Sequence, residues 1–442
     1  MGKSAPRYYE GEPGQILARV WFHIKRKSRK AYSRRIRKLI ARHIRSSKSI
    51  ADLSPRGRLL LRYLVNVTKD YCLVPLKAHS ALPAKAIRLR DGEKFVSAAP
   101  RLPEGEGRRA MGDYPAIEAR VLNDVIGSRS SSFLLSARKG YIPDFYLEQP
   151  DAIISDDRIL IWHGNDGIGL LRIENEQRHQ GGIMVFGAED HNWYHWVIEI
   201  LPAAFLAEYL PAEFSSLPLI VPAEIADLPT FRESLELFRG TRDVIRIGEG
   251  AHHFERLLTI DSLTREPMNM RNGQWPSERD YGFHRGGLLE YRATVLKRLG
   301  IEPVPQSEKL FLARGHGRRS YNQDELLKIS EEMGSRGIFP ERMSFREQVE
   351  TFYRASHVVG PSGAAFANTL FCQPGTRLLS WLVPQYKGFC SFTNIAQVTG
   401  AELRYLFVTP DRPINTTGDA FRASYELEPA AYEAALAAML ES

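Results

Sequence analysis

The sequence predicts an α/β protein, and three observations lead to that class. From residue 182 onward, short apolar runs alternate with segments whose apolar residues recur at helical spacing, as in parallel sheets covered by helices. The composition, with 43% hydrophobic and 25% charged residues, is that of an ordinary globular protein. A length of 442 residues exceeds what one core usually supports, so two or three domains are expected.

The basic residues are concentrated near the N-terminus. Of the 60 Lys and Arg residues, thirteen lie between Pro13 and Ala51 with no acid among them, and removing them leaves 47 basic against 52 acidic residues, a net of −5. We therefore separate residues 1–52 as a basic N-terminal helical extension. A helix there would carry an apolar stripe flanked by Arg and Lys, made of Val20, Ile24, Ile36, Ile40 and Ile44.

Three interpretations of this extension stay open. A basic amphipathic helix suits an anionic membrane surface, because each Lys or Arg near the lipid headgroups is worth about 1 kcal/mol. A solvated tail explains the same residues without any partner. A nucleic-acid arm is the third interpretation, and both others are preferred over it.

Two further features favour a cytoplasmic location. No window of 18 uninterrupted apolar residues is present, and the first fifteen residues, MGKSAPRYYEGEPGQ, contain no apolar run of the kind found in signal peptides. The cysteines Cys72, Cys372 and Cys390 cannot all pair and show no CxxC spacing, which indicates a reducing compartment and argues against a structural zinc site. We expect a cytoplasmic protein, with peripheral contact to the inner membrane if the basic extension binds lipid.

Residues 53–275 are predicted to form the first α/β domain. The stretch 151–173 contains two apolar runs joined by a Gly/Asn/Asp turn, which predicts a hairpin. A strand over 183–187 is followed by a helix over 188–210, which Pro202 is expected to kink or divide. Further short strands at 217–223, 244–250 and 253–260 alternate with helical patterns, so we expect a parallel sheet here.

Residues 276–442 are predicted to form the second domain, after a polar linker at 268–287. Strands are expected at 309–315, 337–342, 357–360 and 377–383, with helices at 287–300, 322–334, 344–356, 364–371 and 428–440. This run of β-α units is typical of a doubly wound, Rossmann-like domain.

Two stretches of the second domain have the composition of an anion site. The turn Gly360–Ala364 follows a strand and opens a helix, so small residues would let a phosphate approach the backbone. Arg314 ends an apolar strand, with Arg319 close behind and Asn322 at the start of the next helix. Guanidinium groups at a strand end favour bidentate phosphate contact, although a packing turn and a solvated loop explain each stretch equally well in isolation.

A third stretch, DHNWYHWVIEILP, has the composition of an acid–base site. His195 and Glu199 lie four residues apart, on one face of a helix, and Asp190 lies at the helix start. The histidine can serve as a general base oriented by either carboxylate, or the residues can form a structural pair. The HExxH zinc pattern and any Asp-x-Asp are absent, so we expect no metal.

In their order along the chain, these stretches resemble glycosyltransferase family 61. The first is an Asn-aromatic-aromatic-His-Trp helix ending Glu-x-Leu-Pro, and the second is a strand ending in Arg with a basic pair and Asn. The third is a Ser-x-x-Glu-Gln helix leading to a Val-Gly-Pro turn, Asn-x-x-Phe and Pro-Gly-Thr. The resemblance covers roughly residues 180–385 and rests on Asn192 to Trp196, Glu199, Leu201, Pro202, Arg314, Arg318, Arg319, Asn322, Ser344, Glu347, Gln348, Val359 to Ala364, Asn368, Phe371 and Pro374 to Thr376.

The resemblance implies a GT-B-like architecture, with two Rossmann-like domains facing across a cleft. It also implies inverting sugar transfer from a nucleotide-sugar to a polysaccharide, such as a capsule, or to a lipid-linked glycan, without a metal or other cofactor. The implied donor-binding residues are Arg314, Arg319, Asn322, Phe339, Gly360, Ser362, Gly363 and Ala364, and the implied catalytic residues are His195, Glu199 and Asp190.

Two positions depart from the family pattern. Ser362 stands where His is usual, and Ser380 stands where a Glu is common. Serine keeps a hydrogen-bond donor but carries no charge. A non-catalytic binding or scaffold protein with a degenerate donor site is therefore the alternative interpretation.

Overall fold

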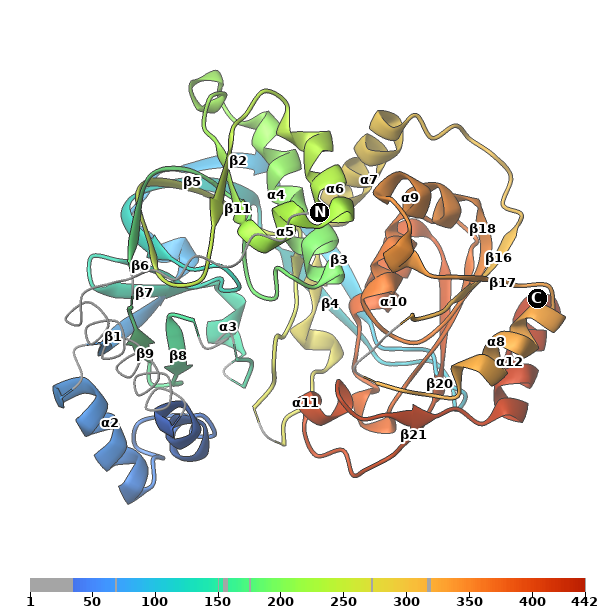
Figure 1. The fold of residues 1–442 in the computed structure, drawn as a ribbon, viewed down its shortest axis with the longest axis horizontal. Helices are drawn as coiled ribbons and strands as arrows, with labels where there is room; N and C mark the ends of the chain where they lie inside the picture. Colours follow the sequence, from blue (N-terminus) through green and yellow to red (C-terminus); the bar gives the residue numbers. More distant parts are fainter. Residues whose placement is uncertain are drawn as a thin grey trace, which may run out of the picture.

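In a computed structural model, the protein is described at residues 35–67, 70–149, 151–153, 158–174, 176–271, 273–315 and 319–441. Figure 1 shows two halves side by side, each built around one sheet with helices packed on it. The α/β class expected from the sequence is confirmed.

The first half contains an eleven-stranded sheet, of which only part is parallel. Ten strands follow the order β12-β11-β10-β13-β5-β6-β7-β1-β9-β8, and β2 pairs with β5. The neighbours β10, β11, β12 and β13 run parallel, as predicted, but β13 meets β5 antiparallel, and so do most of the other pairs. The parallel arrangement expected for the strands between 183 and 260 is therefore confirmed, whereas residues 71–172, for which no parallel sheet was predicted, pair mostly antiparallel. The strands are β1 (Tyr71–Ala78), β2 (Ala86–Arg90), β5 (Ile117–Gly127), β6 (Leu134–Ser136), β7 (Lys139–Ile142), β8 (Leu160–His163), β9 (Ile168–Arg172), β10 (Gln177–Met184), β11 (Leu219–Pro222), β12 (Val244–Ile247) and β13 (His252–Ile260).

The predicted helix over 188–210 is divided into three segments. A π-helix, η2 (His195–Ile200), is followed by α4 (Leu201–Leu206), with Pro202 in its first turn, and by the 3-10 turn η3 (Ala207–Tyr209). The hairpin predicted within 151–173 is confirmed as β8 and β9. The remaining helical segments of this half are α2 (Pro55–Val67), η1 (His79–Ala81), α3 (Phe145–Glu148), η4 (Ala212–Phe214), α5 (Ala223–Asp227) and α6 (Pro229–Arg239).

The second half has the doubly wound sheet that the sequence predicts. Its five strands are parallel and lie in the order β17-β16-β18-β19-β20, so the strand order reverses between β16 and β18. Helix α8 packs against α12, while η7 packs against α9 and α10, and Figure 1 shows these two groups on opposite sides of the sheet. The strands are β16 (Glu308–Leu312), β17 (Arg336–Ile338), β18 (Ala355–Val359), β19 (Arg377–Leu382) and β20 (Glu402–Phe407), and the helices are α7 (Arg285–Leu299), α8 (Gln323–Glu332), α9 (Phe345–Arg354), η7 (Ala364–Phe371), α10 (Ser391–Thr399) and α12 (Pro429–Glu441).

The predicted helix over 364–371 is the 3-10 helix η7 rather than an α-helix. The smaller elements of this half and of the linker are β14 (Thr264–Arg265), η5 (Glu278–Asp280), β15 (Gly282–Phe283), η6 (Pro340–Arg342), η8 (Pro384–Tyr386), β21 (Thr409–Pro410), α11 (Thr417–Ala420) and β22 (Tyr425–Glu426).

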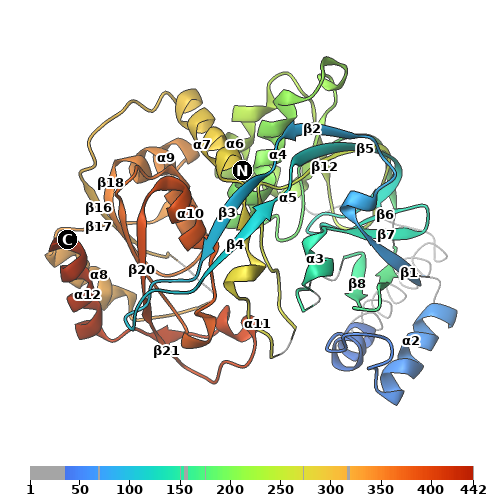
Figure 2. The ribbon, with the colours of Figure 1, turned by 180° about the vertical axis from the view of Figure 1, so that it is seen from behind.

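The hairpin of β3 (Glu93–Ala98) and β4 (Arg109–Tyr114) extends from the first half onto the second. The Ala98 N–H donates to the Asn394 side chain at 3.2 Å, and Thr393 Oγ1 donates to the Ala98 carbonyl at 2.6 Å. Beyond β3, the Tyr405 N–H donates to the Arg101 carbonyl at 2.9 Å. Figure 2 shows both strands reaching β20, so residues 93–114 join the two halves.

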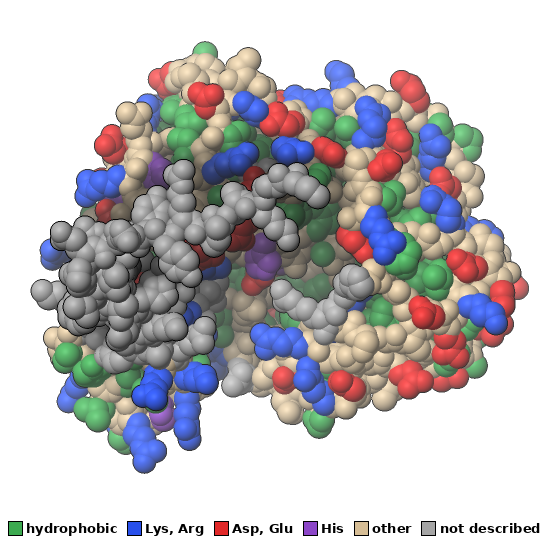
Figure 3. Space-filling view, viewed as in Figure 1, with side chains coloured by type: hydrophobic (Ala, Val, Ile, Leu, Met, Phe, Trp, Pro, Cys, Tyr) green, Lys and Arg blue, Asp and Glu red, His purple; other side chains and the backbone are tan. Residues whose placement is uncertain are grey.

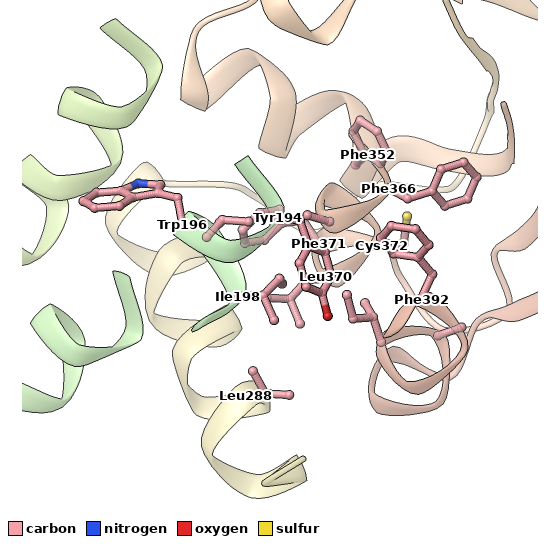
Figure 4. Close-up of a cluster of buried hydrophobic side chains, with 14 of the residues drawn as sticks. Tyr194, Trp196, Ile198, Leu288, Phe352, Phe366, Leu370, Phe371, Cys372 and Phe392 are labelled. Carbon is pink, nitrogen blue, oxygen red and sulfur yellow. The ribbon is translucent and has the colours of Figure 1, made fainter. Parts of the chain in front are cut away.

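One hydrophobic core is continuous between the two halves. Figure 4 shows Tyr194 and Ile198, from the segment around η2, beside Leu370 and Phe371 of η7, while Trp196 points to the other side of η2. Leu288 of α7 and Phe392 of α10 belong to the same buried cluster. Large apolar contacts of this kind hold two domains in a fixed relation.

The described part of the N-terminal extension packs against the first half. Residues 35–43 are helical, and Ile36, Ile40 and Ile44 are buried with Leu61 and Leu64 of α2. The expectation that this stripe faces a membrane is therefore wrong for these three isoleucines, because α2 and β8 cover them. Val20, Ile24 and the rest of residues 1–34 lie outside the described residues. Among the described helices, none combines the length and the apolar character that crossing a membrane requires.

Candidate functional site

The second half brings two of the predicted stretches together where its strand order reverses. Arg314 follows β16, and Gly360 to Gly363 follow β18, the neighbouring parallel strand. The carboxyl ends of two such strands border the crevice in which doubly wound sheets bind ligands. The Ser380 hydroxyl of β19 donates to the Gly360 carbonyl at 2.9 Å and fixes the start of the turn. Ser380 is fully buried in this role.

Two guanidinium groups converge on one backbone carbonyl of this turn. Arg314 Nη2 and Arg319 Nη2 each donate to the Ser362 carbonyl at 3.0 Å. No carboxylate of the described residues pairs with either arginine. Burial, and then the neighbouring charge of Arg314, lower the pKa of Arg319 to about 10. Two cations held close together without a counter-ion favour an anionic ligand.

The turn has small residues because the arginines approach its backbone. A Cβ on Gly363 would lie 2.5 Å from Arg314 Nη2, and one on Gly360 would lie 2.6 Å from Leu312 Cβ. Ser362 contributes its backbone carbonyl to the two arginines. The main-chain geometry of the site therefore does not depend on a histidine at position 362.

Asn322 and Phe339 lie outside this group of contacts. The Asn322 side chain exchanges hydrogen bonds with the backbone of Leu427, at 2.9 and 3.2 Å, and so fixes the segment that carries Tyr425. The guanidinium of Arg342 covers the Phe339 ring at 4.3 Å. Within the described part of the chain, no hydrogen bond joins either side chain to Arg314 or Arg319.

The π-helix η2 carries the predicted acid–base pair. His195 Nδ1 and Glu199 Oε2 lie 2.6 Å apart, and both side chains are largely buried. Burial lowers the pKa of His195, but the charge and hydrogen bond of Glu199 outweigh it and raise the pKa above its ordinary value. Among the described residues, no group bonds His195 Nε2, so that nitrogen can meet a ligand. Short π-helical segments are frequent at functional sites.

Asp190 is placed in a buried ion pair rather than beside His195. Its carboxylate accepts hydrogen bonds from Arg129 Nη2 at 3.1 Å, from the Ser130 N–H at 2.7 Å and from Ser130 Oγ at 2.7 Å. Asp190 is fully buried, and Arg129 is 1% exposed. These contacts occupy both carboxylate oxygens, which favours a structural role for Asp190 over that of a base.

We expect Asp190→Ala to destabilise the fold by about 3 kcal/mol, because Arg129 loses its buried partner and keeps only the exposed carboxylates of Glu224 and Glu249. Urea unfolding followed by circular dichroism measures this loss. Asp227→Ala is the matched control, since its pair with Arg246 joins exposed side chains and is worth about 1 kcal/mol or less. An unchanged unfolding midpoint for Asp190→Ala would contradict the structural role.

A chain of hydrogen bonds joins the acid–base helix to the second half. Trp193 Nε1 donates to Asn368 Oδ1 at 3.0 Å, Asn368 Nδ2 donates to Gln348 Oε1 at 2.7 Å, and Gln348 Nε2 donates to the Pro340 carbonyl at 2.9 Å. In addition, η2 packs directly against η7, whose first residue, Ala364, follows the arginine-bound turn. The three predicted stretches therefore meet in one region, and Figure 3 shows a hollow between the two halves.

Sequence reasoning missed Glu266, which lies at this junction. Its side chain is buried, which raises the pKa of its carboxyl to about 8, and the Tyr194 hydroxyl donates to it. Both residues line a cavity of ≈ 10 Å³, room for about one water molecule, together with Tyr281, Ser391 and Asn394. A single Glu within a polar linker gives no sequence signal, because its burial depends on residues distant in the chain.

A family model supports the resemblance. Residues 193–379 match the family described as Glycosyltransferase 61, a range that is less than half of the chain. It contains His195, Glu199, both arginines and the turn, and it excludes Asp190. A search of the curated proteins returns no match. Among the described residues, no group of three or more His, Cys, Asp or Glu side chains is arranged to hold a metal ion.

Proposed function

We propose that the protein is an inverting glycosyltransferase that moves a sugar from a nucleotide-sugar to a hydroxyl group of a polysaccharide or lipid-linked glycan. The family match supports a glycosyltransferase, and one observation carries the finer proposal. Arg314 and Arg319, without an acidic partner among the described residues, converge at the strand-order reversal of a doubly wound sheet.

The proposed donor site supplies positive charge to the leaving group. When the bond between the sugar and the nucleoside diphosphate breaks, negative charge develops on the diphosphate oxygens. Guanidinium groups already held in place stabilise that charge without reorganisation. The Ser362 carbonyl positions both arginines until the diphosphate binds. The proposed mechanism uses no metal or other cofactor.

The proposed base is His195, acting through Nε2. It takes the proton of the acceptor hydroxyl while that oxygen bonds to the anomeric carbon, on the side opposite the departing diphosphate. The configuration of the sugar is thereby inverted. Glu199, hydrogen-bonded to Nδ1, orients the ring and stabilises the imidazolium that forms. We place this reaction at the cytoplasmic face of the membrane, where lipid-linked acceptors are accessible.

The pair predicts a specific pH dependence. A base must be neutral, so kcat/KM should rise with pH through the His195 pKa, which Glu199 raises above 6.5. Glu199→Gln removes the carboxylate charge that raises the His195 pKa, so the rise of kcat/KM should occur at lower pH. The same pair stabilises the fold fully below pH 6.5, and that contribution is lost as the pH rises through the raised pKa.

Measuring kcat/KM at a series of pH values around neutrality, for the unaltered protein and for Glu199→Gln, checks this dependence. Glu189→Gln is the comparison, because Glu189 also raises the His195 pKa through its charge but forms no hydrogen bond with it among the described contacts, so the pH dependence should move less. If kcat/KM rose over the same pH range in Glu199→Gln as in the unaltered protein, His195 would be excluded as the group whose titration controls kcat/KM.

The proposed function is tested with a panel of nucleotide-sugars. Donor hydrolysis is followed by release of nucleoside diphosphate, and donor binding by the shift in melting temperature. Turnover of one donor, with the anomeric configuration of its product inverted, is the expected result. Neither turnover nor a melting shift with any nucleotide would instead favour the non-catalytic scaffold.

A further inference from the structure

Helix α2 carries an exposed apolar stripe. Leu59, Tyr63 and Val67 follow one another at four-residue spacing, and their exposed fractions are 70%, 42% and 63%. The opposite face of the same helix is buried through Leu61 and Leu64. Because α2 already has a packed face, the stripe is a second, outward-facing apolar surface.

The chain around this stripe is strongly basic. Residues 35–67 contain nine Lys or Arg and one acid, Asp52. Lys48 pairs with Asp151, and the Arg58 guanidinium is held by the Leu53 carbonyl. Figure 3 shows Lys and Arg side chains gathered at the lower left, where Figure 1 places α2. Six exposed basic side chains have no acidic partner among the described residues, namely Arg35, Arg37, Lys38, Arg42, Arg56 and Arg62.

We propose that this surface binds an anionic lipid bilayer. We define the α2 surface as Leu59 and Val67 together with Arg56 and Arg62. The two apolar side chains would enter the headgroup region, and the two arginines would contact lipid phosphates, as in other amphipathic helices that lie on membranes. The proposal does not depend on sugar transfer.

Charge and shape favour lipid over other partners. A second copy of the chain would bring two sets of unpaired cations against each other, which is repulsive. A nucleic acid would contact the arginines but would leave Leu59 and Val67 in water, because its phosphates recognise cations only. A bilayer supplies both anionic and apolar contacts on one plane.

The experiment is co-sedimentation of the full chain with vesicles. One set contains phosphatidylcholine alone, and the other contains phosphatidylcholine and phosphatidylglycerol in equal amounts. We expect binding to the anionic vesicles that is salt-sensitive and much tighter than to the neutral ones. Arg56→Gln with Arg62→Gln should weaken binding by on the order of 25-fold, about fivefold for each charge. Leu59→Ser with Val67→Ser should weaken it by about tenfold or more.

The matched control is Arg232→Gln with Met111→Ser, which removes one exposed cation and one exposed apolar side chain elsewhere. It should bind like the unaltered chain. Melting curves check that each variant folds, and size-exclusion chromatography reports the oligomeric state. Unchanged vesicle binding by both α2 variants would overturn the proposal. A change of oligomeric state in the Leu59→Ser, Val67→Ser variant would overturn it in favour of a second copy, and stronger binding to RNA than to lipid would overturn it in favour of nucleic acid.

Discussion

His195→Ala is expected to lower kcat by about 10²–10⁴-fold while nucleotide affinity stays unchanged, since general-base catalysis contributes about that much. The imidazole lies on η2 in the first half, whereas the arginines of the proposed donor site lie in the second. Removing it takes away the proton acceptor and leaves the diphosphate contacts intact. Steady-state kinetics and calorimetric titration with nucleoside diphosphate separate the two effects.

His191→Ala is the control for this substitution, because it removes a neighbouring imidazole that is paired with Glu189 and lies more exposed. It should keep nearly full turnover. If His195→Ala lost nucleotide binding but kept turnover on saturation, the roles of the two halves would be reversed.

Arg314→Ala is expected to weaken nucleotide binding strongly. The change removes one of the two charged donors and leaves Arg319, which donates to the Ser362 and Ala420 carbonyls, as the other. A hydrogen bond to a charged group is worth about 1.5–3 kcal/mol, so the affinity should fall by about 10- to 100-fold for each arginine removed. Calorimetric titration with nucleoside diphosphate measures the loss.

Two variants sharpen the result. Arg314→Lys keeps the charge but loses the planar fork, so it should retain part of the affinity. Arg346→Ala, on the exposed face of α9, removes an arginine whose ion pair among the described residues is with Glu350, and it should bind normally. Equal affinity in Arg314→Ala and the unaltered protein would place the donor elsewhere.

The second half of the fold was predictable because its signals are local. Strands β16 to β19 were expected because each is an apolar run within a β-α pattern, and their parallel order follows from those crossovers, whereas α10 and β20 were not predicted. The end of β16 at Leu312 and the turn at Gly360 were therefore placed at one edge from sequence alone.

The first half was less predictable because its pairing is long-range. Strand β5 pairs antiparallel with β13, which lies more than a hundred residues further along the chain, and no local pattern specifies such a partner. The isoleucines of residues 35–44 show the same limit. Their spacing predicts an apolar stripe, but only the fold shows that α2 and β8 cover it.

The sequence predicted which residues lie in the candidate site more reliably than it predicted what each of them contributes there. Arg314, Arg319 and the turn do come together, and His195 does pair with Glu199. The sequence could not show that position 362 acts through its carbonyl, because every residue has one. It also could not show that Asp190 is neutralised by Arg129, which lies 61 residues away.

The hairpin of β3 and β4 affects whether the second half can exist in solution without the first. Strand β20 ends the second sheet, and the chain just after β3 lies along it, where Arg101 bridges to Arg404. An open strand edge invites pairing with other chains and so promotes aggregation. Residues of the first half thus cover the exposed edge strand of the sheet in the second half. The second half therefore depends on residues of the first half for its solubility, and a fragment that contains the second half alone is expected to self-associate.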